Sequence, residues 1–476
     1  MKNYFGIFLW ITIVSSVSCI DQKQVASETI DGIWSSVGYG RIAHIDGDSF
    51  ELADYTDISC LIVLEGSLEE AGYNPFVEND TLKIKDGINE YFYTRLASFP
   101  DVCVEEVSEE KQQDPVYNFE VLAKYFEDHY AYFELRNVDW ETLYRKYREK
   151  VTPETTPPQL FNIMTEMLDT FNDGHIGLEA GDEVEEEAEK LMVASKTASG
   201  ISEEIEKEEL GNFDVATASA KQFVTQNLKE SRSKLIKWGI TDNNIGFLQI
   251  NLMFLHADLQ LNDSIAGNDY VEAYFGALED MSSLRHAELE VAGVRAIMEE
   301  ALSDLSTTSS LILDVRFNGG GKDEVALEIM SHFNETQQRV FTKMGRNGAL
   351  YTPAVVVELP AAKTPYLKPL YLLTSVESAS ATEIMVMSSM SLDQVVRLGS
   401  NTEGVFSDVL DNQLPNEWIL GLSNEIYLGN DGKNYEGVGI PPHIDLGYTW
   451  DGQKFLFEVF TDTKADKENI LQAIKN

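Results

Sequence analysis

The residues with the clearest chemical potential lie at two expected strand-to-helix junctions. In the first, LILDVRFNGGG, an apolar segment ends at Asp314 and three glycines follow, Gly319 to Gly321. Consecutive glycines before a helix let the backbone approach a ligand closely and direct amide groups at negative charge. A phosphate-binding loop would need the spacing Gly-x4-Gly-Lys-Ser/Thr, which is missing, so a nucleotide site is not expected.

The second junction, LYLLTSVESASATEI, places Ser378 and Ser380 in a turn between a strand and a helix. A serine on such a turn can present its hydroxyl beyond the edge of the sheet, and the amide of the next residue, Ala381, can then stabilise an oxyanion. Serine is also a common helix cap, so a purely structural role for these serines is the alternative.

A parallel α/β region is needed to position these junctions. Apolar, strand-like segments (IGFLQINLMF, SLILDVRF and PLYLLTS) alternate with helix-like segments at 288–305, 324–333 and 381–390. Strands that alternate with helices predict βαβ units and a largely parallel sheet. The carboxyl ends of such strands are where α/β proteins place their sites.

Upstream of this region the periodicity changes twice. Short alternating runs broken by turn residues predict a small antiparallel β domain over 20–112, and apolar residues three and four apart predict a helical subdomain over 113–182. An acidic, helix-like insertion or linker is expected over 183–237, then the α/β core over 238–460 and a C-terminal tail over 461–476.

The two junctions, together with the segment YEGVGIPPHI near the end of the core, resemble the signature of the tail-specific serine proteases. This family includes the carboxyl-terminal processing peptidases and the tricorn core protease, and the resemblance covers roughly residues 118–182 and 238–450. It implies a ClpP/crotonase-like catalytic core. It also implies that Ser380 is the nucleophile, with oxyanion amides from Ala381 and from Gly319 or Gly320.

The resemblance also suggests the catalytic base. Processing peptidases carry a lysine 25 residues after the nucleophile, but that position is Val405 here, so a Ser–Lys dyad is not supported. The tricorn-like branch uses a histidine in a D-x-H segment and an acidic residue in the last motif, which implies His175 as general base and Glu436 as the residue that orients it. Tricorn has a serine where Gly174 precedes His175.

Other residues of the signature are expected to line the site. Thr402 and Ser407 lie in SNTEGVFS, which resembles a Thr-x-Gly-x-x-Ser segment of relatives without the lysine, and Ser378 belongs to the nucleophile turn. Many processing peptidases also carry a PDZ module before the core. The interval 183–237 lacks its strand pattern and its carboxylate-binding loop, so no PDZ module is expected.

The N-terminus predicts export. One lysine precedes an apolar run that is too short for a membrane span and ends at Cys19, as in a lipoprotein signal over residues 1–19; an ordinary cleaved signal peptide is the alternative. Either would export the protein, and the expected location is a bacterial cell envelope. Any attachment to a membrane would be through lipid alone. In that oxidising compartment Cys60 and Cys103 could form a disulfide, or remain two buried thiols.

Charge and composition exclude several classes of function. The chain has 36 basic and 80 acidic residues, a formal charge of −44, which argues against nucleic-acid binding. It has neither H-E-x-x-H nor a Cys/His cluster, so no metal or cofactor is expected. The sequence therefore predicts an exported serine endopeptidase acting on polypeptides. The alternatives are a non-catalytic binding lipoprotein on the same fold, or a surface lipoprotein whose β domain binds a partner or glycan.

Overall fold

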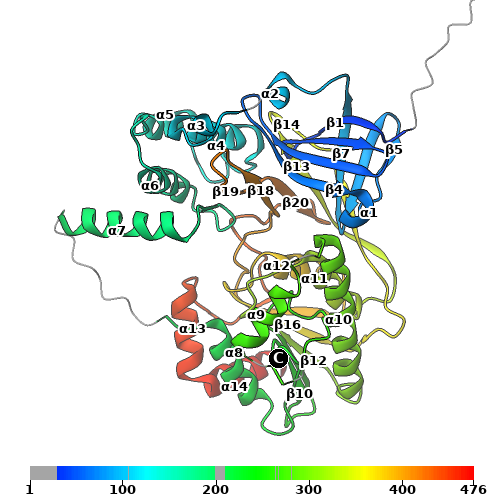
Figure 1. Ribbon diagram of the computed structural model, residues 1–476. Helices are drawn as coiled ribbons and strands as arrows, with labels where there is room; N and C mark the ends of the chain where they lie inside the picture. The colour runs from blue at the N-terminus through cyan, green and yellow to red at the C-terminus, as the bar shows by residue number, and fades with distance from the viewer. Residues whose placement is uncertain are drawn as a thin grey trace, which may run out of the picture.

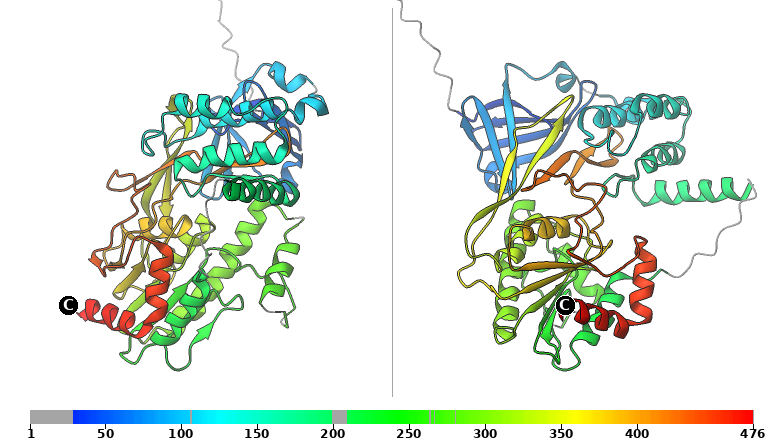
Figure 2. Two further views of the ribbon diagram at one scale, coloured as in Figure 1. Left: turned by 90° about the vertical axis from the view of Figure 1, so that its left-hand side faces the viewer. Right: turned by 180° about the vertical axis from the view of Figure 1, so that it is seen from behind.

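A computed structural model describes residues 29–105, 107–198, 209–262, 264–265, 267–279 and 281–475 (Figure 1). The expected signal segment and Cys19 lie outside these residues. A β domain and a helical subdomain form an upper lobe over an α/β core, as Figures 1 and 2 show. The predicted fold class, a mixed α/β chain with an antiparallel β domain near its N-terminus, is confirmed.

The β domain is an antiparallel sheet with the strand order β4-β3-β2-β1-β7-β6-β5. Its strands are β1 (Gly32–Ser36), β2 (Arg41–Asp46), β3 (Ser49–Tyr55), β4 (Cys60–Ser67), β5 (Phe76–Glu78), β6 (Thr81–Asp86) and β7 (Asn89–Leu96). Alternation along these strands buries one face, where Trp34, Phe50, Leu82 and Tyr93 form the core. The short helix α1 (Leu68–Ala71) follows β4.

A disulfide joins Cys60 of β4 to Cys103 of the short helix α2 (Asp101–Val104). The two cysteines are 43 residues apart in the chain. The bond therefore ties the segment that leaves the β domain back to an edge strand of its sheet.

Replacing both cysteines with alanine is expected to lower the free energy of unfolding of the β domain by about 2–4 kcal/mol, because the cross-link restricts the unfolded chain. Thermal unfolding with and without reductant measures the effect. Reductant should lower the melting temperature of the wild type and leave that of the double variant unchanged. An equal response in the two proteins would contradict the prediction.

The helical subdomain comprises α3 (Glu109–Gln112), α4 (Pro115–His129), α5 (Trp140–Arg148) and α6 (Pro157–Leu168). Asp114 caps α4 by accepting two amides of its first turn, and Pro115 stands where no N–H is needed. The apolar faces of α4 and α6 share a core that includes Phe126 and Met164. From α6 the chain passes through the 3-10 helix η1 (Asp169–Phe171) into the loop that carries His175.

A small antiparallel sheet fixes this loop. Its strands, in the order β18-β19-β8, are β8 (Gly177–Glu179), β18 (Val409–Gln413) and β19 (Ile419–Ser423). β8 begins two residues after His175, and its Gly177 pairs with Gly421 of β19. His175 is thus held beside a segment from near the other end of the chain.

The core sheet has the order β21-β17-β16-β12-β11-β10-β9. Its strands are β9 (Lys229–Glu230), β10 (Ile236–Ile240), β11 (Gly246–Ile250), β12 (Leu311–Asp314), β16 (Leu370–Thr374), β17 (Val395–Gly399) and β21 (Ile444–Asp445). The strands from β11 to β21 run parallel, as predicted. The main core cluster draws on α10 (Ser283–Asp304), α11 (Asp323–Ser331) and α12 (Ala381–Ser389). A further helix, α9 (Asn268–Gly276), precedes α10.

A further antiparallel sheet connects the core to the upper lobe (Figure 1). It consists of β13 (Gln338–Asn347), β14 (Leu350–Tyr351), β15 (Val355–Leu359) and β20 (Glu425–Gly429). β13 pairs with all three of the other strands. Near its upper end Gly345 lies against the ring of Tyr39 from the β domain, so this sheet is in contact with both lobes.

Two segments outside the expected core contribute to it. The interval 183–237 begins with α7 (Asp182–Ala198), which projects from the body of the protein (Figures 1 and 2), but it also contains α8 (Asn212–Phe223). Phe223 of α8 stacks on Phe247 of the core sheet. Beyond α13 (Gly452–Thr461), the expected tail forms α14 (Thr463–Lys475), which buries Ile470 and Leu471 in the same cluster.

Within the part of the chain that the structure describes, no helix combines the length and apolar character needed to cross a bilayer.

Candidate active site

Ser380 occupies the turn between β16 and α12, the second expected junction. Its backbone has φ +54° and ψ −126°, a conformation that costs a residue with a side chain about 1–3 kcal/mol. Its hydroxyl makes no capping hydrogen bond to the described amides of α12. Such strain persists only where the surroundings impose it, and a capping role does not account for it.

Ser378, the other serine of the turn, has a structural role. Its side chain is fully buried, donates a hydrogen bond to the carbonyl oxygen of Val315 at 2.9 Å, and accepts one from the amide of Ser375 at 3.0 Å. These bonds tie the nucleophile turn to the chain that leaves β12. Ser378 was expected to line the site, but its hydroxyl is committed to this structural role.

The glycine run packs directly against Ser380. A Cβ placed on Gly320 would lie 2.7 Å from Ser380 Cβ and 3.1 Å from the amide nitrogen of Ala381, and Gly320 itself has φ +111°. Glycine alone tolerates both conditions. The two junctions meet because β12 and β16 are neighbouring parallel strands. The structure thus brings Ser380, Ala381 and the glycine run together.

Asn318 and Met253 hold the glycine run in place. The Gly320 amide donates to Asn318 Oδ1 at 2.9 Å, and the Met253 amide donates to the Gly320 carbonyl at 2.8 Å. The Lys322 amide donates a second hydrogen bond between these two segments, to the Met253 carbonyl at 3.0 Å. The Gly320 amide is therefore already occupied, whereas among the described residues no partner is found for the amide of the exposed Gly319. Gly319 is the better placed of the two to donate to a ligand.

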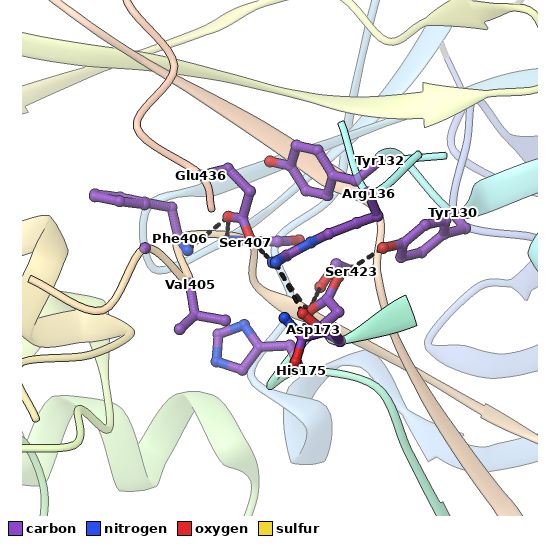
Figure 3. A network of polar contacts seen from close by, with 12 residues as sticks. Tyr130, Tyr132, Arg136, Asp173, His175, Val405, Phe406, Ser407, Ser423 and Glu436 are labelled. Carbon is purple, nitrogen blue, oxygen red and sulfur yellow. Dashed lines mark hydrogen bonds and ion pairs between the residues drawn. The ribbon is translucent and has the colours of Figure 1, made fainter. Parts of the chain in front are cut away.

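Asp173 organises the loop that carries His175. Its Oδ1 accepts hydrogen bonds from the His175 amide at 3.1 Å and from the Ser423 hydroxyl at 3.0 Å. Its Oδ2 accepts the Tyr130 hydroxyl at 2.9 Å (Figure 3). These partners lie just after α4, in the loop itself and at the end of β19, so the loop is anchored to two other parts of the chain.

The ring of His175 lies beside Val405 (Figure 3). Its Nδ1 is buried without a hydrogen-bond partner among the described residues. Burial lowers the pKa of His175 below its usual value, and the Asp173 carboxylate and the backbone of Ser407 oppose this shift only in part. At neutral pH the imidazole is therefore in the neutral form that can accept a proton.

Glu436 pairs with Arg136 and not with His175. Its Oε1 lies 2.9 Å from Arg136 Nη2, and its Oε2 accepts the amides of Phe406 at 2.8 Å and Ser407 at 3.3 Å. Burial raises the pKa of Glu436 to about 7, although the Phe406 amide and Arg136 favour its charged form. In the described structure, Glu436 and His175 are connected through the segment at Ser407 without touching each other (Figure 3).

Glu383, the acidic residue of SASATEI, holds the first part of that segment. It is fully buried, and its two carboxylate oxygens accept the amides of Gly404 at 2.8 Å and Val405 at 2.7 Å. Burial raises the pKa of Glu383 to about 8, against the effect of these hydrogen bonds. The Glu403 amide donates to the Ser378 carbonyl at 3.0 Å. Residues 403–407, hereafter the linking segment, therefore run from the nucleophile turn to His175.

Thr402 and Ser407 are both expected from the sequence to line the site. Thr402 immediately precedes the linking segment, and Ser407 is its last residue. The Thr402 hydroxyl accepts the Ile440 amide at 2.7 Å. The Ser407 hydroxyl accepts the Glu425 amide at 3.0 Å and donates to the Asp408 carbonyl. Both side chains are buried, so they fix the backbone around the site.

A cavity of about 600 Å³ lies between the two halves of the site. Asp173 and Gly174 form one wall, Val376 and Glu377 of the nucleophile turn form another, and the linking segment contributes Val405. Within the described chain no hydrogen bond joins Ser380 to His175. The cavity is lined by Gly174 and Ile176, the neighbours of His175 in the chain, and not by His175 or Ser380 themselves. Catalytic hydrogen bonds are often long or open in a protein without substrate.

Two supporting residues carry no recognisable sequence signal. Arg136 lies in the loop after α4, and its Nη1 also donates to the Asn172 carbonyl at 2.8 Å. Lys343 is buried in β13 and forms an ion pair with Glu425 of β20. Glu383, by contrast, belongs to the SASATEI motif, so the motif itself could have identified it.

Among the residues that the structure describes, no group of three or more His, Cys, Asp or Glu side chains is arranged to hold a metal ion.

Two protein-family models match the chain. The model for peptidase family S41 matches residues 279–446, which contain both strand-to-helix junctions and Glu436. The model for the tricorn protease C1 domain matches residues 111–169, which end shortly before His175. No curated protein is significantly similar in sequence to this chain.

Several solved structures match about three quarters of this chain. Mature CPAF is 12% identical, covering 76% of this chain and 98% of its own, with a TM-score of 0.50. A candidate peptidase from Parabacteroides merdae ATCC 43184 is 22% identical, with coverages of 73% and 95% and a TM-score of 0.48. The photosystem II D1 C-terminal processing protease is 11% identical, with coverages of 75% and 99% and a TM-score of 0.40. At these identities the likeness concerns the fold alone.

Proposed function

We propose that this chain, a tail-specific serine-type peptidase of the S41 kind, cleaves polypeptides with Ser380 as its nucleophile. One observation carries the assignment: Ser380 is held in a strained conformation at the start of α12, directly against Gly320. Neighbouring amides at a helix start are well suited to stabilise negative charge on a substrate oxygen.

In this proposal Ser380 Oγ attacks the carbonyl carbon of the scissile peptide bond while His175 takes the hydroxyl proton. The amides of Ala381 and Gly319 hold the oxyanion. When the tetrahedral intermediate collapses, the C–N bond breaks and His175 gives the proton to the leaving amine. Water then hydrolyses the acyl-enzyme by the same route, with His175 again accepting a proton and returning it to Ser380 Oγ.

For the proton to pass, Ser380 and His175 must come within hydrogen-bond distance of each other. The linking segment contacts both sides, because Glu403 binds the nucleophile turn and Ser407 lies at His175. A shift of one side would therefore be transmitted to the other. Closure of a cleft around a bound substrate is a common step in enzymes, and it also excludes water from the site.

Glu436 was predicted to orient His175 directly. Given its contacts, we propose that Glu436 acts on His175 indirectly. It accepts hydrogen bonds from the amides of Phe406 and Ser407, and the backbone of Ser407 contacts the His175 imidazole. Arg136 keeps the buried carboxylate paired. Glu436 is therefore a positioning residue for the base.

Export and lipid attachment belong to the same proposal. The lipoprotein-like ending at Cys19 would anchor the mature chain to a membrane of the cell envelope through lipid alone. The disulfide between Cys60 and Cys103 supports an oxidising compartment. The substrate would then be a polypeptide of that compartment.

Labelling with a fluorophosphonate tests the nucleophile. Wild-type protein should be labelled at Ser380, and Ser380→Ala should not be labelled. Ser378→Ala should still be labelled at Ser380, but more slowly, because the Ser378 hydroxyl holds the nucleophile turn. Peptide mapping locates the adduct, and circular dichroism measures the folded fraction. Folded wild-type protein that takes no label and cleaves no unfolded polypeptide would contradict the proposal and favour a non-catalytic binding protein.

A further inference from the structure

We propose that the N-terminal β domain is part of the catalytic unit, and that its Tyr39 and Asn89 are positioning residues that act on both halves of the active site through a buried ion pair, Lys343–Glu425. The proposal rests on the assignment of Ser380 and His175 above. It gives the β domain a role in the reaction, in contrast to a separate module that binds a partner or glycan.

The ion pair lies on two adjacent strands. Lys343 Nζ of β13 is 2.6 Å from Glu425 Oε2 of β20, and each side chain is only 2% exposed. Tyr427 of β20 places its hydroxyl 2.9 Å from Lys343 Nζ and 3.1 Å from Glu425 Oε2. A buried pair of charges is stable only when further hydrogen bonds satisfy the remaining donors and acceptors.

The β domain supplies two of these hydrogen bonds. The Tyr39 hydroxyl donates to Glu425 Oε1 at 2.7 Å, and Lys343 Nζ donates to Asn89 Oδ1. Tyr39 lies between β1 and β2, is nearly buried, and packs edge-on against the ring of Tyr91. The β domain therefore completes the coordination of a charge pair that belongs to the rest of the protein.

One side of this cluster leads to His175. The Glu425 amide donates to the Ser407 hydroxyl at 3.0 Å, and the Tyr132 hydroxyl donates to the Glu425 carbonyl at 2.5 Å. Ser407 ends the linking segment, and its backbone affects the pKa of His175. A displacement of Glu425 would therefore move the backbone next to the catalytic base.

The other side leads to the glycine run. The Tyr427 hydroxyl also lies 3.4 Å from Oδ2 of Asp323, the first residue of α11 and the second after Gly321. The turn between β6 and β7 reaches the same helix, because the Ile88 amide donates to Glu324 Oε1 at 3.3 Å. The start of α11, which follows the proposed oxyanion loop, is thus held by the ion-pair cluster and by the β domain.

Removal of the Tyr39 hydroxyl should disturb the site without unfolding the protein. Tyr39→Phe keeps the ring and its packing against Tyr91, but leaves Glu425 Oε1 without its donor. We expect the rate constant for fluorophosphonate labelling of Ser380, and kcat for a peptide substrate, to fall about 10-fold, the scale of one hydrogen bond to a charged group. KM should change little, because the residues concerned do not line the cleft. Asn89→Ala should act in the same direction.

Tyr73→Phe is the matched control. Tyr73 is also in the β domain and also packs edge-on against an aromatic ring, that of Phe50, but it takes no part in the cluster around Lys343. This variant should label and turn over like the wild type. Circular dichroism and thermal unfolding establish the folded fraction of each protein, so that rates are compared per folded molecule.

Amide hydrogen exchange provides a readout that is independent of activity. In Tyr39→Phe the amides of Phe406, Ser407 and Glu425 should exchange faster than in Tyr73→Phe. The proposal would be overturned if exchange at these amides and labelling per folded molecule were both unchanged in Tyr39→Phe. The cluster would then only join the β domain to the rest of the protein. If wild-type Ser380 takes no label, the proposed function fails, while the exchange experiment still decides whether the β domain holds the segment at His175.

Discussion

Replacement of His175 with alanine is expected to lower kcat/KM about 10³-fold, within the range found for the loss of a general base. The residual rate would come from the oxyanion amides and substrate binding, which the substitution leaves in place. His175 is anchored through its backbone by Asp173, and its Nδ1 makes no hydrogen bond in the described structure, so the loop should keep its shape without the ring. Steady-state kinetics with a fluorogenic peptide measure the effect.

We also expect kcat/KM to depend on pH through the protonation of His175. The neutral imidazole is the active form, so the rate falls as the pH falls through the pKa of His175. Burial lowers that pKa from its ordinary value of 6.5, so the acidic limb of kcat/KM should lie below pH 6.5 in the wild type and disappear in His175→Ala.

His44→Ala is the control for loss of a histidine. His44 lies in β2, pairs with Glu51 and does not line the cavity, so its removal should leave both the rate and the acidic limb unchanged. A wild-type acidic limb that survives in folded His175→Ala would show that another group is the base.

Gly320→Ala should reduce kcat/KM and the fluorophosphonate labelling rate about 10²- to 10³-fold, comparable to the removal of an oxyanion donor. The new Cβ would lie 2.7 Å from Ser380 Cβ and 2.9 Å from the carbonyl oxygen of Ala379, at φ +111°. Either the glycine run or the nucleophile turn must then move. Because the clash lies at the turn itself, the chemical step should suffer much more than global stability.

Gly348→Ala is the matched control. Gly348 also has a positive φ, +59°, but it lies in the turn between β13 and β14, where a Cβ would meet nothing within 4 Å. Gly348→Ala therefore tests a positive φ without the clash at Ser380, at an angle that side chains tolerate better than the +111° of Gly320. Similar losses of activity in the two folded variants would show that backbone strain, and not the packing of Gly320 on the nucleophile, accounts for the effect.

The arrangement around Ser380 could be anticipated from sequence because it depends on local pattern. An apolar strand followed by glycines, and another followed by a serine turn, predict two junctions at one edge of a parallel sheet. In the structure β12 and β16 are adjacent, and the expected residues meet. The antiparallel β domain could also be predicted from the sequence, because period-two alternation and turn residues are local signals.

The surroundings of His175 could not be anticipated in the same way. Glu436 could have been paired with any nearby cation, and its partner Arg136 lies 300 positions earlier in the chain. Likewise Lys343 and Glu425 look like surface residues in sequence, but tertiary packing buries them beside Tyr39. The sequence predicts a tail in place of α14, because the few apolar residues of this helix become significant only when α8 and the core sheet are present.

The two buried glutamates that hold the linking segment make the proton binding of the folded protein depend on pH. Glu383 and Glu436 hold its amides with pKa values of about 8 and about 7 in place of 4.5, so the folded protein binds more protons than the unfolded chain in this range. Their contribution to stability is complete below pH 4.5 and is lost as the pH rises through 7 and 8. His175, by contrast, needs a pH above its own lowered pKa. The active site would therefore work in a window bounded below by its base and above by the two carboxyl groups that hold it together.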